Sequence, residues 1–199
     1  MPTKYDDTTL ATLQNEYLRI RDDHHDALQA RAARVTLGSS VIRVFSPGSK
    51  EPMLRHLWRI DLGHLSSIRT QAEFRAWFVK RLGALALVVK KINQENPRIH
   101  PGYKWGHSTK VLCLFIREIV LCSRFFDDRL TDRLAPLLYI PIDGVVIDHV
   151  RRLGVPLVLR QIKDIDSAEK FFGLQDLLGE AASKVGVPRV WLDDVWTQR

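Results

Sequence analysis

Hydrophobic residues near the start of the chain recur at helical spacing. Residues 8–33 are dense in charge, and their apolar positions lie on one face of a helix: Leu10, Leu13, Tyr17, Ile20, Ala27 and Leu28. This pattern predicts one long or broken surface helix. Residues 35–45 are rich in β-branched side chains and run up to the turn signal Pro47-Gly48, so they predict a short strand or an extended connection.

Two central segments have stronger helical patterns. The sequence from Thr70 to Glu73 has the spacing of a capping box and opens an apolar face over residues 74–92. Residues 93–107 contain two prolines and two glycines and predict an irregular loop. Residues 110–126 are apolar almost all round, which is typical of a buried central helix capped by the preceding Ser108 or Thr109. The tryptophans Trp58 and Trp77 sit on periodic apolar faces and are predicted core residues.

The last third of the chain predicts a linker and more helices. Residues 127–141 form the linker, and Asp143 has the position of an N-cap before a short amphipathic helix over residues 144–153. Capping-box spacing recurs at residues 166–169, before a helical region that ends near residue 186. We therefore expect a mostly α protein forming a single domain over residues 1–199, with residues 1–100 and 101–199 as candidate lobes.

Composition excludes several classes of protein. A hydrophobic fraction of 45% in 199 residues is enough to bury a core, so disorder is excluded. The longest apolar run, residues 82–89, is too short to cross a bilayer, and the N-terminus lacks the apolar run of a signal peptide. Cys113 and Cys122 lie nine residues apart in one predicted helix, about 13 Å along its axis, and cannot pair with each other. We expect two buried, reduced thiols in a cytoplasmic, monomeric protein.

The charge of the chain points to an anionic partner. The formal net charge is +7 at pH 7, with a pI near 9.6. Clustered Lys and Arg release counterions when they bind a phosphate backbone, so nucleic acid is the expected partner. The alternative is a basic protein whose charge serves only solubility.

Lys110 is unusual at the start of a buried helix. In the predicted first turn the helix dipole presents about half a positive charge, where Asp or Glu would be expected. The dipole, together with burial near Phe115, would favour the neutral amine, which is the nucleophilic form of a lysine. The alternative is an exposed Lys110 whose stem carries the ammonium to water or a phosphate. Lys104 is a competing nucleophile, but it lies in the predicted loop, away from any helix dipole or core.

Asp143 has two compatible interpretations. As an N-cap it stabilises the following helix by about 1 kcal/mol. A carboxylate held there can also face an adjoining cleft, where it stabilises developing positive charge or accepts a proton.

These two residues carry a resemblance to a known family. The helix-start lysine lies in residues 106–113 (GHSTKVLC), and the aspartate follows 33 positions later in residues 140–150 (IPIDGVVIDHV). This arrangement resembles the helix-hairpin-helix DNA glycosylase superfamily, and its spacing and the tail at residues 191–196 (WLDDVW) are closest to the archaeal type of 8-oxoguanine DNA glycosylase/lyase. The resemblance covers about a third of the chain. The family's Leu-Pro-Gly-Val-Gly hairpin is interrupted here by residues 103–105.

The resemblance implies a fold, an activity and a set of site residues. The fold would have two helical lobes with a cleft between them. The activity would be excision of a modified purine such as 8-oxoguanine, with Lys110 forming a Schiff base, Asp143 assisting, and no metal or other cofactor. Candidates for binding the flipped base are Trp105, Phe115, Asp193 or Asp194, and Trp196. Candidates for contacting the DNA backbone are Lys90, Lys91, Lys104, His107, Arg151 and Arg152.

Two other interpretations of the sequence stay open. One is a non-catalytic nucleic-acid-binding or accessory module, including one in antiphage defence, in which Lys110 contacts a phosphate and Asp143 only caps a helix. The other is related chemistry on a substrate other than DNA. An enzyme requires Lys110 and Asp143 on a common cavity with an aromatic wall, whereas a binding module requires only a basic surface.

Overall fold

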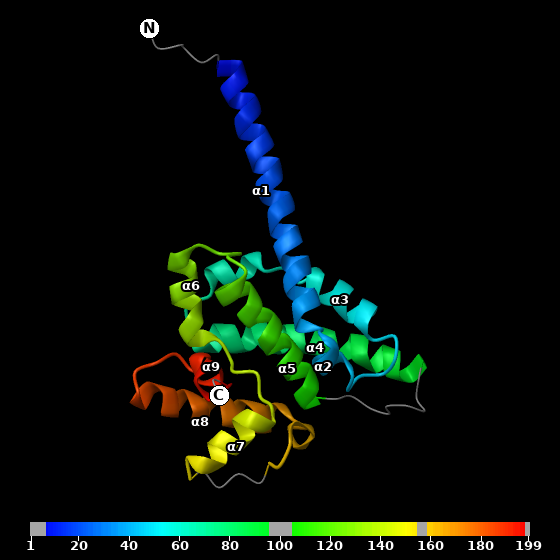
Figure 1. Cartoon of the computed structure of the whole chain (residues 1–199), viewed down its shortest axis with the longest axis vertical. Helices are drawn as coiled ribbons and strands as arrows, with labels where there is room; N and C mark the ends of the chain where they lie inside the picture. Colours follow the sequence, from blue (N-terminus) through cyan, green and yellow to red (C-terminus); the bar gives the residue numbers. More distant parts are fainter. Residues whose placement is uncertain (1–6, 96–104, 155–158, 198–199) are drawn as a thin grey trace.

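The computed structural model describes residues 7–95, 105–154 and 159–197, and all elements in these ranges are helical (Figure 1). The α-helices are α1 (Asp7–Thr36), α2 (Ser39–Ile42), α3 (Lys50–Trp58), α4 (Gln71–Glu95), α5 (Trp105–Arg117), α6 (Asp128–Leu134), α7 (Gly144–Arg152), α8 (Ala168–Lys184) and α9 (Trp191–Thr197). Four shorter helical turns are η1 (Gly63–Ser67), η2 (Glu118–Cys122), η3 (Ala135–Leu137) and η4 (Ile162–Asp164). The predicted mostly α fold is confirmed.

Helices α4 and α5 cross the middle of the molecule. Figure 1 shows α7, α8 and α9 at one end, whereas the N-terminal half of α1 projects away from the other. One cluster of buried side chains joins elements from both halves of the chain, from Ala32 in α1 to Leu192 in α9. The central position predicted for the helix after Lys110 is confirmed, since Val111, Leu112 and Phe115 are completely buried.

The start of α4 has the predicted capping box. The backbone N–H of Thr70 donates to Oε2 of Glu73 at 3.0 Å, and the N–H of Glu73 donates back to Oγ1 of Thr70 at 3.2 Å. A further bond from the Arg69 N–H and these backbone donors hold the pKa of the Glu73 carboxyl below its usual value. Below the cap, Phe74 and Phe78 pack against Tyr139, which anchors the long helix to the core.

The prediction of a short strand or an extended connection over residues 35–45 is wrong. Helix α1 continues to Thr36, and α2 adds a helical turn after Gly38. Ala32, Ala33 and Leu37 lie on the buried side of this region, whereas the β-branched Val35 faces solvent. Burial of the helical face therefore outweighs the β-propensity of the segment.

The predicted start of the central helix is also wrong. Helix α5 begins at Trp105, so Ser108 and Thr109 lie inside it, and neither caps it. The hydroxyl of Thr109 instead donates to the carbonyl of Gly106 at 2.8 Å. A side chain that bonds back along its own helix is compatible with an interior position.

Three smaller predictions need correction. The predicted linker over residues 127–141 contains α6, whose N-cap Asp127 accepts the N–H of Leu130. Trp77 is in the core as predicted, but Trp58 at the end of α3 is 49% exposed. Cys113 is buried, and burial raises the pKa of its thiol, whereas Cys122 is exposed. Neither cysteine forms a disulfide.

Gly106 permits a close approach between α5 and η4. A Cβ atom at this position would overlap the carbonyl oxygen of Ile162 and lie 3.1 Å from the Cβ of Ile165. The absence of a side chain therefore lets the start of α5 rest against the turn that follows α7.

We expect Gly106→Ala to destabilise the protein by about 1–3 kcal/mol, because the added methyl group meets backbone atoms that cannot rotate away. The matched control is Gly83→Ala in α4, where a Cβ meets nothing within 4 Å. There, alanine should stabilise the helix by up to about 1 kcal/mol. Urea denaturation measures both free energies of unfolding, and a stabilising Gly106→Ala would contradict the close approach.

Candidate functional site

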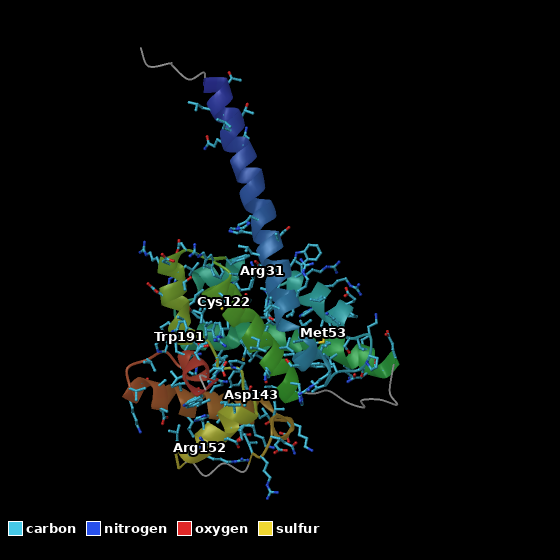
Figure 2. The ribbon with its side chains drawn as sticks, in the orientation of Figure 1. Arg31, Met53, Cys122, Asp143, Arg152 and Trp191 are labelled. Atoms are coloured by element: carbon cyan, nitrogen blue, oxygen red, sulfur yellow. The ribbon has the colours of Figure 1, made fainter. Side chains whose placement is uncertain are left out.

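Lys110 and Asp143 line the same pocket. The pocket has a volume of about 210 Å³ and lies between the segment around α2, the start of α5, the start of α7 and η4. Its other lining residues include Arg43, Phe45 and His107. Asp143 marks the start of α7, close to α5 (Figure 2). The two residues singled out from the sequence are therefore neighbours in space.

The two oxygens of Asp143 have different partners. Oδ1 accepts the backbone N–H of Val146 at 3.1 Å, which confirms the predicted N-cap of α7. Oδ2 accepts a hydrogen bond from Nζ of Lys110 at 3.0 Å. The side chains of Lys110 and Asp143 are 26% and 30% exposed, so the ion pair is partly shielded from water and open to the pocket. The cap fixes the carboxylate, which in turn holds the amine in place.

Lys110 is not in the first turn of its helix. It is the sixth residue of α5, so the dipole effect expected at the N-terminus is much reduced. The closest charged group to its amine is instead the carboxylate of Asp143, at 3.0 Å. For Lys110 to act as a nucleophile, its proton must first leave, and Asp143 is positioned to accept it.

A buried amide positions the segment that carries Asp143. Residues 138–143 lie between η3 and α7. The N–H of Ile140 donates to Oε1 of Gln175 at 3.1 Å, and Nε2 of Gln175 donates to the carbonyl of Ile140 at 2.7 Å. The guanidinium of Arg189, also buried, donates to the carbonyl of Leu138 at 3.0 Å. These bonds satisfy backbone groups for which a helix would otherwise provide partners.

One wall of the pocket comes from the segment predicted to be a short strand or an extended connection. The ring of Phe45 meets the imidazole of His107 edge to face, with 6.4 Å between ring centroids. Arg43 is exposed and adds a cation to the lining. The presence of Phe45 as the first aromatic residue after Tyr17 is the only sequence signal for this wall, and it is weak.

Two of the predicted base-binding residues pack into the body of the protein. Phe115 is completely buried in the core. Trp105 is partly buried, and its ring lies 5.9 Å from that of Phe171. Neither side chain lines the pocket around Lys110.

The C-terminal candidates are engaged with other side chains. The guanidinium of Arg117 donates to Oδ2 of Asp193 at 2.9 Å and also to Asp194. Burial raises the pKa of the Asp193 carboxyl, and Arg117 opposes this effect. Trp196 stacks on His149 with 5.0 Å between ring centroids. None of these residues lines the pocket of Lys110, although Asp193 is close enough to Asp143 and Lys110 for their charges to act on its carboxyl.

The residues predicted to contact the DNA backbone do not gather at one place in the structure. His107 lines the pocket, and Lys90, Lys91 and Arg152 are exposed on α4 and α7. Arg151 pairs with Asp148 at 2.9 Å and donates to the carbonyl of Leu159. Lys104 lies outside the described residues.

The described residues contain no group of three or more His, Cys, Asp or Glu side chains that could hold a metal ion. Within the same ranges, no helix combines the length and apolar character needed to cross a membrane. In comparisons with known proteins, no family model, no curated protein and no solved structure matches this chain.

We expect Asp143→Ala to cost about 1–2 kcal/mol, because it removes both the cap and the ion pair. Asp143→Asn keeps an oxygen that can accept from Val146 and should cost roughly 1 kcal/mol less. Chemical denaturation of both variants compares the two costs. An equal loss of stability in both would mean that the cap contributes nothing.

Gln175→Leu should lower the free energy of unfolding by about 2–5 kcal/mol, since it leaves the buried N–H and carbonyl of Ile140 without their partner. The neighbouring Asp176→Asn serves as the control. It loses only the exposed ion pair with Arg75, which should be worth at most about 1 kcal/mol. Similar losses in the two variants, measured by thermal or urea unfolding, would show that the buried amide has no special role.

Proposed function

We propose that this protein is a DNA base-excision glycosylase with AP lyase activity, in which Lys110 is the nucleophile and Asp143 assists it. The observation that carries the proposal is the common pocket: an amine and a carboxylate at 3.0 Å line one cavity with an aromatic wall. The spacing of the two residues in the sequence, which resembles that of helix-hairpin-helix glycosylases, led to the same pair independently of the structure.

The proposal includes the two-lobe arrangement of that superfamily. The pocket is lined from both halves of the chain, by Arg43 and Phe45 on one side and by His107, Lys110 and Asp143 on the other. A cleft between two lobes would bring residues together in this way.

The size of the pocket suits a single base. Pockets for drug-sized ligands usually have volumes of about 300–1,000 Å³, and this one is smaller, at about 210 Å³. A base must leave the duplex stack before its glycosidic carbon can be attacked, so a base-sized pocket next to the nucleophile is what the reaction needs. The imidazole of His107 and the small exposed part of Phe45, whose side chain is otherwise buried, provide aromatic surface against which a base can pack.

The reaction begins with proton transfer and substitution at the sugar. The Lys110 ammonium gives a proton to Asp143, and the neutral amine attacks C1′ of the nucleotide. The bond between Nζ and C1′ forms while the bond between C1′ and the base nitrogen breaks. The electron pair of the broken bond goes to the base, which takes up the proton from Asp143 or solvent.

The covalent intermediate then breaks down in steps that cleave the DNA strand. The bond between C1′ and the ring oxygen breaks, the oxygen takes a proton, and a Schiff base to Lys110 remains. Asp143 or water accepts a proton from C2′, and the electron pair of that C–H bond forms a C=C bond as the 3′ phosphate leaves with its own electron pair, which nicks the strand. Water finally hydrolyses the Schiff base and frees the amine. Asp143 stabilises the positive charge that develops on the sugar during the first step.

Borohydride trapping tests the proposal, because it reduces the Schiff base to a stable protein–DNA adduct. Duplexes carrying 8-oxoguanine, uracil or an abasic site are incubated with the wild-type protein and with the Lys110→Gln and Asp143→Asn variants. We expect an adduct with at least one wild-type reaction, none with Lys110→Gln, and a rate about 10²–10⁴-fold lower with Asp143→Asn.

Lys170→Gln is the matched control, because Lys170 is also paired with an aspartate, at 2.8 Å, but lies on α8 and does not line the pocket. This variant should form the adduct at the wild-type rate. An adduct that persists in Lys110→Gln would reject Lys110 as the nucleophile. The absence of any wild-type adduct on duplexes that the protein binds would favour the non-catalytic nucleic-acid-binding module.

A further inference from the structure

A second hollow lies between α3 and α4, apart from the pocket of Lys110. Its volume is about 490 Å³. The apolar part of its lining comes from Pro52, Val88 and Ile92. The charged part has the cations Arg55, Arg59 and Lys91 and a single carboxylate, that of Glu95. We call this hollow the basic groove. Its shape and charge together would concentrate anions.

The three cations of the basic groove have no acidic partner among the described residues. Elsewhere in those residues, basic side chains such as Arg75, Arg117, Arg151 and Lys170 pair with carboxylates. Arg55, Arg59 and Lys91 are exposed and form no such pair within the described ranges. Their charge is therefore available to a ligand.

The helix dipole explains only part of this arrangement. Cations near the C-terminus of α3, such as Arg55, are stabilised by the negative end of the helix. Lys91 lies on α4, and the last turn of that helix contains no basic residue. The helix dipole alone therefore does not explain why cations from two helices line one hollow.

The backbone at the end of α3, which carries Arg55 and Arg59, is held by hydrogen bonds from a buried side chain. Nε2 of the buried Gln29 donates to the carbonyls of Leu57, Trp58 and Ile60 at 3.0, 2.8 and 2.9 Å. Arg55 precedes these anchored residues and Arg59 lies between the last two of them, so the two arginines are about one helical turn apart. The anchored backbone fixes where the two arginine side chains begin, which reduces the entropy lost when they bind a ligand.

His56 also lines the basic groove but adds little charge at neutral pH. Burial lowers the pKa of its imidazole, and the nearby Arg81 lowers it further. The positive potential of the groove therefore comes from Arg55, Arg59 and Lys91.

The basic groove is connected to the wall of the Lys110 pocket. The hydroxyl of Ser46 donates to Oδ1 of Asn93 at 2.7 Å in a buried hydrogen bond. Ser46 directly follows Phe45 of the pocket, and Asn93 directly follows Ile92 of the groove. One buried hydrogen bond thus joins residues next to the two sites.

We propose that the basic groove binds backbone phosphates of the DNA strand that flank the base held near Lys110. The inference rests on the proposed function for the identity of the partner. Arg55 and Arg59 would contact phosphates through their guanidinium groups, and Lys91 would contribute a point charge from the opposite side.

The salt dependence of binding tests this proposal, because each phosphate contact adds about 0.9 to the slope of log K against log salt concentration. Fluorescence anisotropy with an undamaged labelled duplex compares the wild type with the triple variant Arg55→Gln, Arg59→Gln and Lys91→Gln. We expect the slope to fall by about 2–3, which corresponds to roughly 100-fold or more weaker binding at 0.1 M salt.

The control removes the same charge elsewhere, by Lys80→Gln, Arg129→Gln and Lys184→Gln, three exposed cations that lie outside the basic groove. Its slope should fall by less than 1. Equal slopes for the two triple variants, or a wild-type protein that does not bind the duplex, would overturn the proposal. Thermal unfolding checks that both variants are folded.

Borohydride trapping separates this inference from the proposed function. The basic-groove variant should still form the covalent adduct at low salt and saturating protein, because Lys110 and Asp143 are unchanged. Both proposals are supported if the salt-dependence slope falls in the basic-groove variant and the variant still forms the adduct. If the slope falls in the basic-groove variant but the wild-type protein forms no adduct, the basic groove is supported and the catalytic role of Lys110 is rejected.

Discussion

The candidate site depends on one buried amide. Ile140 lies in a non-helical segment of a protein whose described elements are all helices, so no neighbouring strand satisfies its N–H and carbonyl. Gln175, which is completely buried, takes both roles and acts as a substitute for a paired strand. With this segment fixed, Asp143 lies at the start of α7, where its carboxylate accepts a hydrogen bond from Nζ of Lys110. An unpaired backbone group at this depth would be costly enough to displace the segment.

Local signals were sufficient to identify the pair at the centre of the site. Asp143 stands before an amphipathic helix, and N-caps are encoded within a few residues of the chain. Lys110 stands out because it opens an apolar run that could only be a buried helix. The capping box of Thr70 and Glu73 was readable for the same reason. The caps of α4 and α7 were thus predicted correctly from neighbouring residues, whereas the local signals at Ser108, Thr109 and Asp127 were misread.

Features that depend on tertiary contacts were not predictable in this way. The segment before Phe45 has β-branched residues, but the burial of Ala33 and Leu37 decides its helical conformation. The start of α5 depends on its contact with η4, which lies more than fifty residues further along the chain. Trp196 lies on the acidic tail predicted to bind a base, yet its ring is stacked on His149. A pairwise contact of this kind leaves no trace in the periodicity of one segment.

The glycine at the start of α5 has a consequence for how this protein can diverge in evolution. Because no side chain fits between Gly106 and the backbone of Ile162, a chain that drifts at this position must also move η4, and with it one wall of the Lys110 pocket. Surface positions of the same helix face no such restriction. A glycine four residues before the lysine is therefore a better marker for recognising distant relatives than the aromatic residues around it.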